Sequence, residues 1–385
     1  MAERSSRREI AVLVGLDFGK GGYDESIEEL GQLAASAGIQ ARALVRGRRD
    51  RPDSALFAGS GKVEEIKRTL QEQGASLAIF NHDLSPAQER NLEKALGCPI
   101  VDRTRLILNI FGQRAKSHEG KLQVELAQLE HAATRLVRGW THLERQRGGR
   151  GFMGGMGETQ LEVDRRLIAN RVKLLKDKLG KLGRRREVQR RARERGRAFS
   201  VSLVGYTNAG KSTLFNTLTR AGALAEDRLF ATLDTTTRRL YLPEAGNVAI
   251  SDTVGFIRDL PHTLVAAFRA TLEEAAHADL LLHVVDAASD AREAQILEVD
   301  KVLAEIGANA VPRLLVWNKI DRNGLHPGVD RNEYDRICRV RLSARTGDGV
   351  EGLRRALIEA AASRTSPASP PKPTDSKKLS QAATT

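Results

Sequence analysis

The sequence has only two cysteines, Cys98 and Cys338, and they lie far apart in the chain. Neither belongs to a C-x-x-C pair, which excludes a disulfide framework and a cysteine-rich zinc cluster. So few thiols are typical of proteins that work in a reducing compartment, and we expect a cytoplasmic protein.

Long apolar runs are also missing. None approaches the roughly 18 uncharged apolar residues that a transmembrane helix needs, so we expect no stable membrane insertion. The charged residues 1–8 lead into a short apolar run, Ile10–Leu16, which Asp17 interrupts. That run is too short for a secretory signal.

Basic charge, in contrast, is abundant and concentrated. The chain has 62 Lys and Arg against 49 Asp and Glu, a net charge of +13. Between Arg165 and Arg197 we count 15 basic and 3 acidic residues, so this segment alone carries 15 − 3 = +12. We call it the basic stripe. Such a segment attracts polyanions, with nucleic acid favoured over anionic membrane, and a solvated helix face is the alternative interpretation.

Apolar patterns divide the 385 residues into four parts. Residues 1–112 alternate strand-like and helix-like segments, which predicts a small α/β domain with a parallel sheet. In residues 113–198, leucines recur every three or four positions in two runs separated by the glycine-rich segment Gly148–Gly157. This spacing predicts a long antiparallel helical hairpin with a glycine-rich tip, whose second helix carries the basic stripe. Residues 199–362 return to strand–helix alternation, and residues 363–385 have the composition of a disordered tail.

A phosphate-binding motif opens the third of these parts. The apolar run Ser200–Val204 leads into Gly205-Tyr206-Thr207-Asn208-Ala209-Gly210-Lys211-Ser212, and a helix-like run follows. This is G-x-x-x-x-G-K-S between a strand and a helix, the context that a phosphate loop requires. Lys211 would reach the β- and γ-phosphates, and the Ser212 hydroxyl would bind Mg²⁺. The earlier Gly59-Ser60-Gly61-Lys62 lacks the first glycine, and we interpret it as a loop that starts a helix.

Two further motifs follow predicted strands. They are Asp252-Thr253-Val254-Gly255 and Asn318-Lys319-Ile320-Asp321. Asp252 would support the Mg²⁺ shell, and the Gly255 amide would sense the γ-phosphate. Asp321 can accept hydrogen bonds from the guanine N1–H and N2–H pair, which adenine lacks, so the second motif selects GTP over ATP. Ser343-Ala344-Arg345 would supply a backbone amide to the guanine O6.

The segment Phe230-Ala231-Thr232-Leu233-Asp234 lies between the phosphate loop and the D-x-x-G motif. A threonine there would close the Mg²⁺ shell when the γ-phosphate is present, which makes the segment a candidate switch. Because Thr235, Thr236 and Thr237 follow, composition alone does not select Thr232.

Phe256 follows Gly255, where many GTPases have a glutamine that orients water. Phenylalanine has no polar group to do this, so we predict slow intrinsic hydrolysis and leave the catalytic residue unassigned. Asn208, inside the phosphate loop, has two open interpretations: a loop-shaping residue, or a ligand for K⁺.

The sequence resembles the HflX family of ribosome-associated GTPases over about residues 8–362. The resemblance is carried by the four nucleotide motifs and by Asp102-Arg103-Thr104, Phe111-Gly112, Gln113-Arg114-Ala115, Glu119–Leu129 and Gly157–Glu162. It implies a fold of a small α/β domain, a helical hairpin and a P-loop GTPase domain with a mostly parallel sheet between helices. It also implies Ser212 and Thr232 as Mg²⁺ ligands.

The same resemblance implies binding of GTP and GDP, binding to the large ribosomal subunit and GTPase stimulation by the ribosome. It further implies dissociation of stalled or stress-generated ribosomes. We expect a monomer when free. Two positions depart from the family pattern, since Met156 and Thr235 stand where prolines are usual. Other classes remain open: an RNA-binding module with a regulatory guanine-nucleotide site, or a GTPase with a peripheral membrane-associated fraction.

Overall fold

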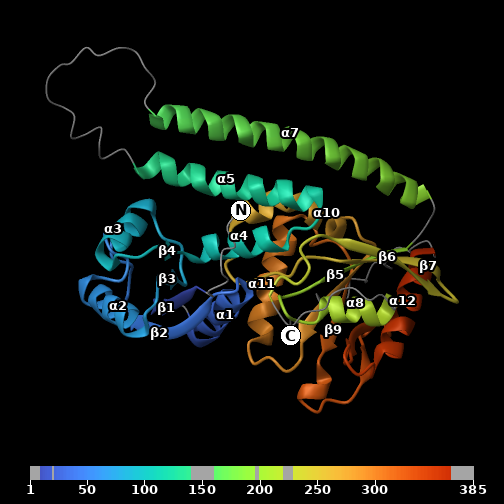
Figure 1. Ribbon diagram of the computed structural model, residues 1–385. Helices are drawn as coiled ribbons and strands as arrows, with labels where there is room; N and C mark the ends of the chain where they lie inside the picture. Colours follow the sequence, from blue (N-terminus) through green and yellow to red (C-terminus); the bar gives the residue numbers. More distant parts are fainter. Residues whose placement is uncertain (1–8, 20, 140–159, 196–198, 220–228, 366–385) are drawn as a thin grey trace, which may run out of the picture.

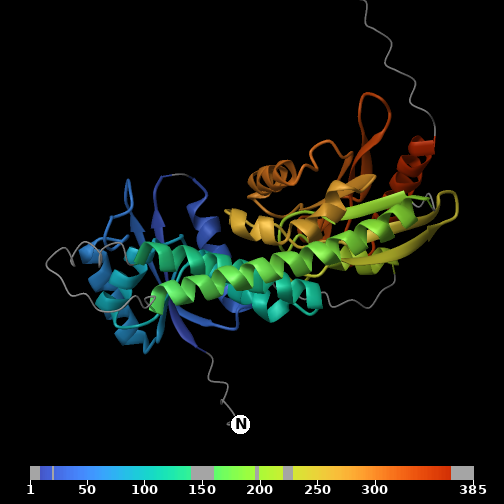
Figure 2. The ribbon, with the colours of Figure 1, turned by 90° about the horizontal axis from the view of Figure 1, so that it is seen from above.

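The computed structural model describes residues 9–19, 21–139, 160–195, 199–219 and 229–365. A small sheet with its helices lies at one end of the molecule and a larger sheet with its helices at the other. Two long helices run side by side across both parts (Figure 1, and from above in Figure 2).

The N-terminal part is built on a four-stranded sheet of order β2-β1-β3-β4 in which every pairing is parallel. This confirms the predicted parallel sheet. Its elements are β1 (Ile10–Asp17), α1 (Tyr23–Ser36), β2 (Gln40–Arg48), α2 (Ser60–Gln73), β3 (Leu77–Phe80), α3 (Pro86–Leu96), β4 (Ile100–Val101) and α4 (Arg103–Arg114). As predicted for Gly59–Lys62, α2 starts there, and the Lys62 amine donates to the Arg46 carbonyl at 2.8 Å.

Helix α4 was not singled out by the sequence pattern. It buries residues on most sides, so it lacks the one-sided apolar stripe by which a surface helix is recognised. Its buried apolar side chains are Leu106, Ile107, Leu108, Ile110 and Phe111.

The two long helices are α5 (His118–Gly139) and α7 (Gln160–Arg195). Leu122 and Leu126 of α5 pack in one buried cluster with Leu175 of α7, within the predicted leucine seam. The ion pairs Glu119–Arg186 and Glu130–Lys176 follow opposite orders along the two helices, so the hairpin is antiparallel as predicted. The glycine-rich tip, with Met156, lies outside the described residues.

The C-terminal part has a seven-stranded sheet of order β10-β11-β9-β8-β5-β7-β6, antiparallel only where β6 meets β7 and β10 meets β11. The strands are β5 (Phe199–Val204), β6 (Thr236–Leu242), β7 (Gly246–Asp252), β8 (Leu280–Asp286), β9 (Arg313–Asn318), β10 (Gly328–Arg331) and β11 (Ile337–Arg341). Helices α8 (Lys211–Thr219) and α12 (Val350–Thr365) cover one face. The other face carries α9 (His262–Ala267), α10 (Arg269–Ala276) and α11 (Arg292–Glu305).

One hydrophobic core crosses from the N-terminal part into the C-terminal part. Leu30 of α1 and Phe111 of α4 belong to the same buried cluster as Phe230 and Phe256. The ring centroids of Phe111 and Phe230 lie 4.6 Å apart in an edge-to-face arrangement. The N-terminal and C-terminal parts therefore share one core at this boundary.

At the carboxyl end, α12 continues through Thr365, three residues into the segment predicted to be a disordered tail. Within this last turn the Ser363 hydroxyl donates to the Glu359 carbonyl at 2.9 Å. The rest of the predicted tail, residues 366–385, lies outside the described residues. Within the described ranges, no helix combines the length and apolar character needed to cross a membrane.

Candidate nucleotide site

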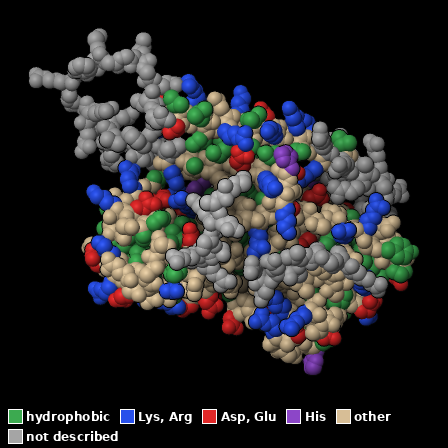
Figure 3. Space-filling view, viewed as in Figure 1, with side chains coloured by type: hydrophobic (Ala, Val, Ile, Leu, Met, Phe, Trp, Pro, Cys, Tyr) green, Lys and Arg blue, Asp and Glu red, His purple; other side chains and the backbone are tan. Residues whose placement is uncertain are grey.

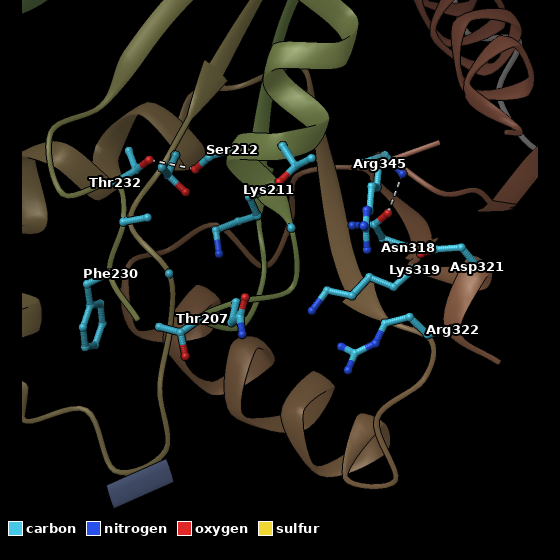
Figure 4. Close-up of a pocket in the computed structure, with 17 residues that line it drawn as sticks. Thr207, Lys211, Ser212, Phe230, Thr232, Asn318, Lys319, Asp321, Arg322 and Arg345 are labelled. Atoms are coloured by element: carbon cyan, nitrogen blue, oxygen red, sulfur yellow. Dashed lines mark hydrogen bonds between the residues drawn. The ribbon is translucent and has the colours of Figure 1, made fainter. Parts of the chain in front are cut away.

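A cavity of about 580 Å³ opens where four parallel strands of the larger sheet end. In such sheets the loops after the strands form the binding edge, because the carboxyl ends of the strands meet there. Figure 4 shows the lining side chains converging on this cavity. The residues that line it are Thr207, Asn208, Gly210, Lys211, Ser212, Thr213, Phe230, Ala231, Thr232, Thr253, Gly255, Asn318, Lys319, Asp321, Arg322, Ala344 and Arg345.

The phosphate loop has a backbone that requires glycine at two positions. Gly205 and Gly210 have φ of 148° and 92°. A Cβ on Gly210 would lie 2.2 Å from Asn318 Nδ2, and one on Gly205 would lie 2.2 Å from the Val284 carbonyl oxygen. Asn208 has a φ of 60°, a conformation that asparagine tolerates better than most residues, which fits its loop-shaping interpretation.

Lys211 extends from the start of α8 beneath this loop. Its Nζ donates hydrogen bonds to the carbonyl oxygens of Gly205 and Tyr206 at 3.0 and 2.8 Å. Burial lowers the pKa of Lys211 to about 8. The amine lines the cavity and can place a positive charge on a bound phosphate chain.

Three oxygen-bearing side chains meet at one side of the cavity. The Ser212 hydroxyl donates to Asp252 Oδ2 at 2.7 Å, and the Thr232 hydroxyl donates to the same oxygen at 2.9 Å. The two hydroxyls lie 2.8 Å apart (Figure 4). Burial raises the pKa of Asp252, and its Oδ1 is buried without a hydrogen-bond partner in the described part of the chain. Hard oxygen donors gathered in this way fit Mg²⁺.

Asn318 ties three of the predicted segments together. Its Nδ2 donates to the Ala209 carbonyl at 2.8 Å, and its Oδ1 accepts from the Ala344 amide at 2.9 Å. Lys319 forms an ion pair with Asp286 at 2.8 Å, and Asp321 lies exposed at the rim. Through Asn318 the base-recognition motif is thus fixed to the phosphate loop, and Asp321 lines the same cavity.

Not every residue that the motifs singled out lines the cavity. Ala209, Val254, Ile320 and Ser343 are buried behind it, and Leu233 packs into the shared core. Gly205, Tyr206 and Asp252 also stand behind the lining, where they support Lys211 and Ser212. Asp234 points elsewhere: its carboxylate accepts hydrogen bonds from the amides of Lys116 and Ser117, at the start of α5.

Phe256 is fully buried and is absent from the cavity lining. Its backbone pairs with the phosphate loop, since the Thr207 amide donates to the Phe256 carbonyl at 2.7 Å and the Phe256 amide donates to the Gly205 carbonyl at 3.1 Å. The residue after D-x-x-G therefore serves to join two loops of the site, and its side chain packs in the core.

Comparison with known proteins agrees with these motifs. Three family models match in succession: GTP-binding GTPase N-terminal over residues 24–112, GTP-binding GTPase Middle Region over residues 114–193, and 50S ribosome-binding GTPase over residues 200–319. The GTPase HflX of Escherichia coli strain K12 is 52% identical over 360 residues, 93% of this chain and 84% of that protein. The chain belongs to the HflX family of GTPases.

Other relatives extend the same result. The GTPase HflX of Magnetococcus marinus is 52% identical over 85% of this chain and 76% of its own length. Among solved structures, a GTP-binding protein from Sulfolobus solfataricus in complex with GDP covers 93% of this chain and 100% of its own, at 23% identity and a TM-score of 0.47. As a member of the HflX family, the chain is a P-loop enzyme that hydrolyses GTP.

This HflX-family chain also has a buried polar network that sequence reasoning missed. The Tyr206 hydroxyl of the phosphate loop donates to Glu29 of α1, and Glu29 pairs with Arg103 of α4. The Arg258 amide donates to the Tyr206 hydroxyl at 2.8 Å, and Arg103 donates to the Arg258 carbonyl at 3.1 Å. Burial and the Glu29 charge raise the pKa of Tyr206. No local sequence pattern predicts this link, because Tyr206, Glu29 and Arg103 lie far apart in the chain.

Proposed function

We propose that this chain is a GTP-driven switch that binds the large ribosomal subunit and dissociates stalled ribosomes, with hydrolysis stimulated by the ribosome. One observation carries the proposal. The segment 230–234 places Thr232 in the nucleotide cavity and Asp234 on the start of α5, while the partner helix α7 carries the basic stripe. One short segment therefore contacts both the nucleotide cavity and the start of the charged hairpin.

The nucleotide is bound in three parts. Lys211 and the amides of the phosphate loop hold the phosphates at the N-terminus of α8. Asp321 accepts the guanine N–H pair, and the Lys319 stem lies over the base. The Ala344 amide is already bonded to Asn318, so the adjacent Arg345 amide is the one we assign to the guanine O6.

Ser212 and Thr232 would hold Mg²⁺, with Asp252 behind them. When bound, the ion neutralises negative charge on the β- and γ-phosphate oxygens. Thr232 is available to it only when the segment 230–234 is in the arrangement seen here. We propose K⁺ as an additional ion held by Asn208.

Hydrolysis in the isolated chain is slow in this proposal, because the buried Phe256 has no polar group with which to orient water. The ribosome would complete the site. This arrangement restricts turnover to the bound state, as a switch requires.

Recognition of the ribosome rests on the basic stripe. Lys and Arg side chains recur along α7 on the face shown in Figure 3. Contacts with several rRNA phosphates release counterions, so affinity should fall steeply as salt rises, and a flat salt dependence would contradict the contact. We propose that residues 1–112, 113–198 and 199–362 act as anchoring, RNA-contacting and nucleotide-binding units.

GTP turnover measured with and without large ribosomal subunits, in K⁺ and in Na⁺ buffer, tests the proposal. A switch enzyme speeds up many-fold with subunits, and a K⁺ site adds a further rise in K⁺ buffer. The alternative, an RNA-binding module with a regulatory nucleotide site, predicts unchanged turnover. Equal rates in the two buffers would contradict the proposed K⁺ site but not the proposed switch.

A further inference from the structure

Strand β6 forms one edge of the seven-stranded sheet and pairs only with β7 among the described strands. Side chains alternate along it. Leu240 and Leu242 point into the core against α8, so Arg239 and Tyr241 project from the opposite face. Tyr241 is 67% exposed, in a chain with only 4% aromatic residues. Because most of the Tyr241 side chain is exposed, packing in the core does not account for a tyrosine at this position.

The surroundings of Tyr241 are basic. Arg238 and Arg239 are both exposed, and neither makes an ion pair with the residues that the structure describes. Glu244 is the one acidic residue in the segment from Thr236 to Asn247. The carboxyl end of α7 lies beside β6 and β7 in both views (Figures 1 and 2). The sequence of α7 is rich in Lys and Arg, so this edge of the GTPase domain lies beside a basic helix.

We infer that the outer face of β6 is a second RNA-contact surface, on which Tyr241 stacks an unpaired base while Arg239, on the same face of the strand, holds a flanking phosphate. An exposed aromatic ring beside a guanidinium group suits single-stranded nucleic acid, because each base offers a flat face and each linkage a negative charge. A single exposed ring is too little apolar surface for a protein or membrane partner. The inference rests on the proposed function only in naming the polyanion as RNA.

Strand β6 closely follows the segment 230–234, which we propose as the switch. The strand begins at Thr236, two residues after Asp234 and four after Thr232. RNA held on β6 would fix the carboxyl end of the segment 230–234. Binding there would favour the arrangement in which the Thr232 hydroxyl reaches Ser212 and Asp252.

The test uses the full chain with a non-hydrolysable GTP analogue and fluorescently labelled short RNAs, single-stranded and double-stranded, in an anisotropy titration. Tyr241→Ala should weaken single-stranded RNA binding about fivefold or more, since stacking on one aromatic side chain contributes ~1–3 kcal/mol. Tyr241→Phe should keep the affinity, and double-stranded RNA should bind both variants as it binds the wild type. Basal GTP turnover should be unchanged in both, which reports correct folding.

Tyr334→Ala is the matched control. Tyr334 is 74% exposed in the turn between β10 and β11, at the opposite edge of the same sheet. Wild-type single-stranded RNA affinity in Tyr241→Ala, or an equal loss in Tyr334→Ala, would overturn the inference. Binding of large subunits by the wild type, measured in parallel, separates the two hypotheses. If the wild type binds subunits and Tyr241→Ala keeps wild-type RNA affinity, only the inferred RNA contact on β6 is wrong. If the wild type binds neither subunits nor RNA, the proposed function is wrong.

Discussion

Asp234 and Ser117 are joined by two hydrogen bonds, although 117 positions separate them in the sequence. The Ser117 amide donates to Asp234 Oδ2 at 2.8 Å, and the Ser117 hydroxyl donates to the other carboxylate oxygen. The Lys116 amide adds a third bond at 3.0 Å. Since Thr232 lies two residues before Asp234, any rearrangement of Thr232 on loss of the γ-phosphate acts directly on the start of α5.

Replacement of this carboxylate should uncouple the hairpin from the nucleotide. Asp234→Ala leaves the two amides at the start of α5 without an acceptor, which costs about 1 kcal/mol of unfolding free energy. We expect GTP affinity within about twofold of wild type but a large loss of stimulation by large subunits. Calorimetry and turnover assays measure the two effects. Full stimulation in Asp234→Ala, with the expected loss of stability, would show that the contact only stabilises the fold.

Base selection should depend on Asp321. In Asp321→Asn an amide replaces the carboxylate, so the guanine N–H pair loses its acceptor and affinity for GTP should fall tenfold or more, on the order of the 1.5–3 kcal/mol of a charged hydrogen bond. Xanthine offers an oxygen in place of the exocyclic amine, and xanthosine triphosphate should bind better to the variant than to wild type. Competition binding measures both. Asp335→Asn, in the exposed turn after β10, is the control, and retained GTP preference in Asp321→Asn would make the base assignment wrong.

The phosphate loop, D-x-x-G and N-K-x-D segments could be placed from sequence because each is a short contiguous motif that follows a strand, and parallel strands bring such loops to one edge. The leucine spacing likewise predicted the seam around Leu175. Contacts between distant positions left no such signal. Glu29 meets Tyr206 across 177 residues, and Asp234 accepts a hydrogen bond from the Lys116 amide across 118 residues. These pairings depend on how the parts pack, which local periodicity does not encode.

The Tyr206 network should stabilise the junction of the N-terminal part with the phosphate loop. Tyr206→Phe removes the hydroxyl, so the Arg258 amide loses its acceptor and Glu29 loses a donor. A buried polar group left unpaired costs ~1–3 kcal/mol, and the denaturation midpoint should fall accordingly. Tyr241→Phe removes an exposed hydroxyl instead and should leave the midpoint unchanged. Equal midpoints for Tyr206→Phe and wild type would contradict the network's contribution.

Acid sensitivity should arise in part from His283 of β8. Burial lowers the pKa of His283 to about 4, so the folded protein keeps it neutral while the unfolded chain takes up a proton near pH 6.5. The contribution of neutral His283 to the free energy of unfolding is therefore complete above pH 6.5 and is lost as the pH falls toward 4. Between pH 7 and 5 the loss should be about 2 kcal/mol. The free energy of unfolding, measured by urea denaturation at both pH values, should differ less between them for His283→Leu than for the wild type. An equal difference in the two proteins would exclude His283 as the cause.

Co-sedimentation with purified large ribosomal subunits, in a non-hydrolysable GTP analogue and in GDP, tests the central claim most directly. In the proposed switch, Thr232 and Asp234 couple the nucleotide cavity to α5, so the chain should pellet with subunits in the triphosphate state and remain largely in the supernatant with GDP. Asp234→Ala should narrow that difference. Equal pelleting of the wild-type chain in the two nucleotide states would contradict a nucleotide-driven switch.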